Sequence, residues 1–128
     1  MDMNVPVLLI IFRRPDKTRQ VFESIRKVQP PKLFIAADGP RPDRPKEQHK
    51  CGEAREVVEN VDWECEVHRN YADENMGAGL RPATGISWAF DHVDKLVILE
   101  DDCLPDPSFF YFCSRMLERY ADVSQVMH

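Results

Sequence analysis

Short apolar runs alternate with stretches of helical periodicity along this 128-residue chain, and this alternation constrains its fold more than any other feature. Apolar runs of strand length occupy residues 5–12, 33–37 and 96–99, and residues 65–71 form a weaker, more polar candidate for a third strand. Apolar residues recur at helical spacing over 15–28, 51–61, 86–93 and 109–120. The pattern predicts strands and helices in strict alternation.

Strict alternation of this kind favours an α/β fold built on a parallel sheet. Right-handed crossovers then place helices on both faces of the sheet, which gives three layers. The runs are apolar on consecutive residues, as expected for strands that are buried on both faces. We therefore predict one Rossmann-like domain over residues 1–128, with strand order 3-2-1-4.

The composition limits the classes of partner. Hydrophobic residues make up 43% of the chain, which is enough for a buried core in one domain. The formal net charge of -5 argues against nucleic acid as a bulk electrostatic partner. No apolar stretch approaches the ~20 residues of a membrane span, and residues 1–4 lack the basic start of a signal peptide. We expect a cytoplasmic protein without a membrane span.

Three adjacent carboxylates, Glu100, Asp101 and Asp102, follow directly on the apolar run 96–99. Neighbouring carboxylates raise each other's pKa unless a positive charge lies among them, and a divalent cation removes this electrostatic cost. Oxygen ligands favour Mg²⁺ or Mn²⁺, which complete their coordination with water and substrate phosphates. The cluster therefore predicts a metal-assisted site for a nucleotide or sugar nucleotide. The alternative is an acidic turn that caps a helix starting near Ser108.

The strand order also predicts where a ligand binds. In the order 3-2-1-4, the topological switch point lies between the first and fourth strands, and ligands bind there at the carboxyl ends. Arg14 lies in the turn after the first strand, and Asp38 follows the second strand. We expect Arg14, Asp38 and the acid cluster to line one crevice suited to a base, a ribose and a diphosphate. The first turn lacks G-x-G-x-x-G, which disfavours a dinucleotide cofactor.

A glycine-rich motif, residues 77–84, precedes the third expected helix. It resembles the G-x-G-x-R-x-x-P-x-T phosphate loop of sugar nucleotidyltransferases, but those proteins carry the loop directly after their first strand. Gly77, Gly79 and Arg81 could still face a diphosphate through backbone amides and a positive side chain. The alternative for Arg81 is a solvated helix start, and both interpretations stay open.

Other conspicuous side chains are expected to have structural roles. Trp63 and Trp88 lie beside helical stripes and are expected in the core. The charge-rich run 43–50 is expected to be an exposed helix face or loop. The histidines share no ligand spacing and are expected at the surface or in local hydrogen bonds.

Three segments together resemble a known family. They are residues 5–10 running into Arg14, residues 37–39, and the acid triplet followed by Pro105 and the aromatic residues 109–112. With these segments the chain resembles the nucleotide-diphospho-sugar transferases of the GT-A fold, in the branch that includes N-acetylglucosaminyltransferase I and bacterial relatives. The resemblance extends over essentially the whole chain.

The resemblance implies roles for individual residues. Arg14 and Asp38 would contact the nucleotide. Glu100 and Asp101 would lie near the ribose and phosphate, and Asp102 would bind Mn²⁺ as part of the family's D-x-D motif. The implied activity is that of a metal-dependent glycosyltransferase, which transfers a sugar from a nucleotide-diphosphate donor, expected to be a UDP-sugar, to an acceptor hydroxyl.

Transferases of this fold use a second half for the acceptor site and the catalytic base, and no base can be named within residues 1–128. We therefore expect a donor-binding half of a longer transferase, or a naturally short relative, which does not transfer sugar by itself. A truncated half would expose a sheet edge or apolar surface and self-associate. The alternatives are a non-catalytic nucleotide-sugar binding module and a sugar nucleotidyltransferase.

Overall fold

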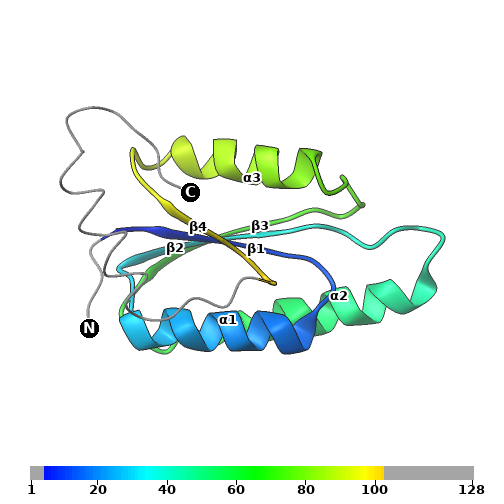
Figure 1. Ribbon diagram of the computed structural model, residues 1–128, viewed down its shortest axis with the longest axis horizontal. Helices are drawn as coiled ribbons and strands as arrows, with labels where there is room; N and C mark the ends of the chain where they lie inside the picture. The colour runs from blue at the N-terminus through cyan, green and yellow to red at the C-terminus, as the bar shows by residue number, and fades with distance from the viewer. Residues whose placement is uncertain (1–4, 103–128) are drawn as a thin grey trace.

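The computed structural model describes residues 5–102 of the chain, in which strands and helices alternate (Figure 1). The elements, in chain order, are β1 (Val7–Ile11), α1 (Pro15–Val28), β2 (Lys32–Ala37), α2 (Pro45–Val57), β3 (Glu66–Tyr71), α3 (Leu80–Phe90) and β4 (Val97–Glu100). The helix expected over 109–120 lies outside the described residues. No helix within 5–102 has the length and apolar character that crossing a membrane requires.

The strands form a four-stranded sheet in the order β3-β2-β1-β4. Every neighbouring pair is parallel, and Leu9 of β1 lies opposite Ile35 of β2 and Leu99 of β4. The predicted α/β fold and strand order are confirmed. All the strands therefore end at the same edge, and the switch point lies where β1 meets β4.

Helices cover both faces of the sheet, with α1 and α2 packed together on one face and α3 on the other (Figure 1). Because successive side chains of a strand point to opposite faces, the buried residues of the sheet divide into two sets. The set on the α1 and α2 face includes Val7, Leu9, Ile11, Leu33, Ile35, Ala37, Val97 and Leu99. The set on the α3 face includes Leu8, Ile10, Phe34 and Ala36. Burial on both faces accounts for the continuous apolar runs in the sequence.

The first helix follows its sequence signals closely. Pro15 occupies the first turn, where its missing N–H has no partner to lose. Val21, Phe22, Ile25 and Val28 are buried, as their spacing predicts. The helix ends at Val28, and the next residue, Gln29, caps it with a left-handed φ of 48° and donates its amide to the carbonyl of Ile25.

The second helix begins earlier than its apolar stripe predicts. It starts at Pro45 and ends at Val57, whereas the apolar spacing suggested 51–61. The prediction for the charge-rich run 43–50 is wrong at Glu47, which is only 4% exposed. Glu47 forms ion pairs with Arg13 and Arg41, so its burial depends on charged partners that helical periodicity does not reveal.

Candidate functional site

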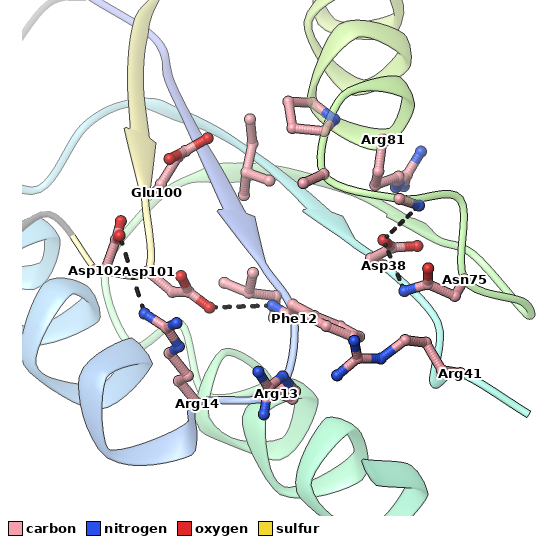
Figure 2. Close-up of a pocket in the computed structure, with 15 residues that line it drawn as sticks. Phe12, Arg13, Arg14, Asp38, Arg41, Asn75, Arg81, Glu100, Asp101 and Asp102 are labelled. Atoms are coloured by element: carbon pink, nitrogen blue, oxygen red, sulfur yellow. Dashed lines mark hydrogen bonds and ion pairs between the residues drawn. The ribbon is translucent and has the colours of Figure 1, made fainter. Parts of the chain in front are cut away.

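A pocket of about 440 Å³ opens at the edge of the sheet where the strands end (Figure 2). Its walls come from the ends of β1, β2 and β4 and from the loop before α3. The charged and polar residues that line it are Arg13, Arg14, Asp38, Arg41, Asn75, Arg81, Glu100, Asp101 and Asp102. The structure thus brings Arg14, Asp38 and the acid cluster together at the switch point of the sheet.

Asp101 is held at the junction of β4 and β1. Its backbone N–H donates to the carbonyl of Ile10 at 3.0 Å, which continues the ladder one residue past β4. Its Oδ2 accepts the backbone N–H of Phe12 at 3.2 Å (Figure 2). Burial raises the pKa of the Asp101 carboxyl, and the nearby Glu100 and Asp102 act in the same direction, against the Phe12 amide and Arg14. A cation beside Asp101 would offset the free-energy cost of keeping this carboxyl ionised.

Asp102 and Glu100 are the accessible carboxylates of the cluster. The Asp102 carboxylate lies 3.9 Å from Nη1 of Arg14, and both side chains are about half exposed. Glu100, the last residue of β4, is also exposed. Within residues 5–102, no three His, Cys, Asp or Glu side chains converge as a ready-made metal cage. Mg²⁺ and Mn²⁺ need no such cage when phosphates and water supply most ligands, so the donor set fits an ion held by one or two carboxylates.

Asp38 anchors the loop that precedes α3. Its carboxylate is buried and accepts hydrogen bonds from the backbone amides of Gly39, Met76 and Gly77 and from Nδ2 of Asn75. Each carboxylate oxygen accepts two of these bonds, at 2.8–3.2 Å. Asp38 therefore shapes the pocket wall by fixing the backbone that forms it.

The loop held by Asp38 needs glycine at two points. Gly77 has a φ of +94°, which side chains disfavour, and it lines the pocket. A Cβ on Gly39 would lie 2.6 Å from the carbonyl carbon of Glu74, so the loop passes directly over this residue. Gly79 caps the start of α3 and is not among the residues that line the pocket.

Arg81 lines the pocket but is only 4% exposed, so its interpretation as a solvated helix start is wrong. Its Nε donates to the carbonyl of Ala37 at 3.2 Å, and its Nη2 donates to the backbone and side-chain oxygens of Asn70. Nη1 donates to Oγ1 of Thr84 at 3.3 Å. The guanidinium thus joins α3 to the ends of β2 and β3, and most of its donors are already engaged.

Arg55 makes the corresponding contact from the opposite face. Its Nη2 donates to the carbonyl of Asp38 at 3.1 Å and to that of Ala72 at 2.7 Å. The guanidinium also lies over the ring of Tyr71, 4.9 Å from its centre. The ends of β2 and β3 are therefore tied by one arginine from α2 and by another from α3.

The sequence pattern missed Arg41 and Asn75, which line the pocket, and Glu47, which holds Arg41 in place. Glu47 accepts bonds from the backbone amide, Nε and Nη2 of Arg41, and its Oε2 lies 3.4 Å from Nε of Arg13. Hydrogen bonding to Arg41 lowers the pKa of Glu47 to about 2. The position of Arg41, shortly after Asp38-Gly39 in the sequence, could have indicated a place in the pocket. Residues that follow a strand directly lie at the edge of the sheet where ligands of such folds bind.

The geometry defines an α/β protein with a charged pocket at the switch point of its sheet. No family model, no curated protein and no solved structure matches the chain.

Proposed function

We propose that this chain binds a nucleotide-diphosphate sugar together with Mg²⁺ or Mn²⁺, as the donor-binding part of a glycosyltransferase. One observation carries the proposal: a pocket at the switch point of a β3-β2-β1-β4 parallel sheet has accessible carboxylates at one end and arginines along its wall. Ligands of open α/β sheets bind in this position. A UDP-sugar has a diphosphate and a base, two groups that such a pocket can bind at different places.

The β4 end of the pocket suits the diphosphate. Asp102, with Glu100 beside it, would hold the divalent ion, which supplies charge neutralisation for the leaving diphosphate. Arg14, already within 3.9 Å of Asp102, is placed to contact phosphate oxygens at the same end. Asp101 keeps its bond to the Phe12 amide and holds the β4 and β1 ends together.

Sugar transfer requires more than donor binding. An acceptor hydroxyl attacks the anomeric carbon while the bond to the diphosphate oxygen breaks, and a base accepts the hydroxyl proton in inverting enzymes. Among residues 5–102, the carboxylates that line the pocket are Asp38 and the acid cluster, and each already has a role there. We therefore assign donor binding to these residues and leave the acceptor and the base outside them.

The other two classes have less structural support. A sugar nucleotidyltransferase would use residues 77–84 as its phosphate loop, but this loop follows β3, and Arg81 within it is bonded to strand carbonyls. A non-catalytic binding module would use the same pocket. Turnover of the donor separates such a module from the transferase.

Calorimetry with UDP, in the presence of Mn²⁺ or of EDTA, tests the proposal. We expect Mn²⁺ to strengthen UDP binding at least tenfold and Asp102→Ala to remove this dependence. Asp94→Ala is the matched control, because Asp94 is an exposed aspartate at the opposite end of β4. Equal affinity in Mn²⁺ and EDTA for folded wild-type protein would overturn the metal-dependent site.

A further inference from the structure

Glu47 joins two arginines that belong to different strand ends. Arg13 lies in the turn after β1, Arg41 lies in the loop after β2, and Glu47 lies in the first turn of α2. The Glu47 carboxylate is paired with both guanidinium groups and is almost fully buried. One negative charge therefore holds two positive charges at the β1–β2 side of the pocket.

The arginines keep donors available to a ligand. The bonds of Arg41 to Glu47 use its Nε and Nη2, and Arg13 faces Glu47 through Nε. No partner within residues 5–102 accepts a hydrogen bond from Nη1 of Arg41 or from either Nη atom of Arg13. Both residues line the pocket, and guanidinium groups donate but never accept. The wall of the pocket that Arg13 and Arg41 form therefore favours a ligand whose edge carries hydrogen-bond acceptors.

An aromatic ring lies on the same side. Phe12 lines the pocket between the strand ends, and it is drawn with Arg13 and Arg41 in the lower half of Figure 2. The Arg13 guanidinium lies over the Phe12 ring, 5.7 Å from its centre, so a base would stack on the opposite face. An aromatic face beside donor groups is a suitable platform for a nucleobase, which stacks through its plane and bonds through its edge.

The chemistry of the two ends of the pocket would set the direction of a bound nucleotide. β4 and β2 lie on either side of β1, so their ends are roughly 10 Å apart at the usual strand spacing. With the diphosphate at the carboxylates after β4, the nucleoside would extend across β1 toward Phe12 and Arg41. The base then reaches the arginine wall.

We propose that Arg41, positioned with Arg13 by Glu47, selects nucleotides whose base presents a carbonyl acceptor at the pyrimidine 4 position or the purine 6 position. The inference rests on the proposed function and names the class of donor nucleotide. Uracil and guanine carry an oxygen at these positions, whereas cytosine and adenine carry an amino donor. An amino group facing Arg41 would leave two donors opposed and unpaired.

Calorimetric titration with UDP, CDP, GDP and ADP in Mn²⁺ tests this selection. UDP and CDP form a matched pair that differs at the base edge while keeping the same ribose and diphosphate. We expect UDP to bind at least tenfold more tightly than CDP, and GDP to bind more tightly than ADP. Equal binding of all four would overturn the selection by Arg41 and leave the diphosphate site standing. Absence of binding by all four would overturn both.

Variants test the direct role of Arg41 and the positioning role of Glu47 through the same ratio of affinities. Arg41→Gln should reduce the ratio of UDP to CDP affinity to about one, because a glutamine amide offers a donor or an acceptor. Glu47→Gln should reduce the same ratio, since it releases Arg41. Lys46→Gln is the control, because it removes an exposed positive charge from the same helical turn outside the pocket. A ratio that stays at the wild-type value in folded Arg41→Gln would overturn the inference.

Discussion

The Asp38 carboxylate accepts the backbone N–H of Met76 at 2.8 Å, and this bond ties the end of β2 to the loop before α3. Three further donors converge on the same carboxylate, from Gly39, Asn75 and Gly77. The loop that forms one wall of the pocket is therefore held by a side chain from the neighbouring strand end.

Replacement of Asp38 by alanine should lower the free energy of unfolding by about 3 kcal/mol, because it leaves buried amides without their acceptor. Binding of UDP should weaken, while binding of the divalent ion at the β4 end should be retained. Urea unfolding and calorimetry measure the two effects. Asp43→Ala, at an exposed aspartate, should change stability by less than ~0.5 kcal/mol. Unchanged stability in Asp38→Ala would show that the loop does not depend on this carboxylate.

Two glycines should respond to alanine in opposite directions. Gly39→Ala places a Cβ 2.6–2.8 Å from backbone atoms of Asp73 and Glu74, so it should cost roughly 2 kcal/mol or more. Gly52 lies within α2, and a Cβ added there would meet no neighbouring atom within 4 Å. Gly52→Ala should therefore gain about 0.5–1 kcal/mol from helix propensity. Thermal unfolding of both variants checks the signs, and equal effects would contradict the close passage of the loop over Gly39.

Arg81→Lys tests whether Arg81 holds the strands or the ligand. A lysine ammonium cannot span the carbonyls of Ala37 and Asn70 as the guanidinium does, so stability should fall by roughly 2 kcal/mol. Nucleotide affinity of the folded protein should change less than threefold. Denaturant unfolding and titration with UDP give both numbers. A tenfold loss of affinity at unchanged stability would instead indicate direct contact with phosphate.

The ion pairs of Glu47 give a defined pH dependence. Its pKa in the folded protein is about 2, below the ordinary value of ~4.3, so its stabilisation is complete above that ordinary value. The stabilisation is then lost as the pH falls from ~4.3 toward 2. The difference in unfolding free energy between wild type and Glu47→Gln should be constant from pH 7 to 5 and decrease below that range. A decrease already between pH 7 and 5 would contradict the lowered pKa.

The sheet could be predicted from the sequence because the burial of its strands produces a recognisable pattern of apolar residues. Strands covered on both faces read as continuous apolar runs, and the helical stripe of α1 matches the face that it buries. The boundaries of α2 were harder. Its first turn carries Glu47, whose burial depends on Arg13 from another strand end, and a local pattern contains no information about that partner.

The candidate site could be predicted in position more readily than in detail. Parallel strands bring Asp38 and Asp102 to the same edge of the sheet, independently of the contacts that their side chains make. The bonds of each residue depend on loop conformation instead. Arg81 bonds to carbonyls at the ends of β2 and β3, and these contacts arise only after α3 has packed on the sheet.

The ties made by Arg55 and Arg81 place two arginine cross-links on the β2–β3 side of the pocket. Both guanidinium groups fasten the carbonyl ends of β2 and β3, one from each layer of helices. Within the described residues, the β4 end is joined to its surroundings by the bond from the Asp101 backbone N–H to the Ile10 carbonyl, by the Asp101–Phe12 bond and by the half-exposed pair of Arg14 and Asp102. The two sides of the pocket therefore differ in kind, because guanidinium groups join the strand ends at β2 and β3, whereas the side-chain contacts at the β4 end are made by carboxylates.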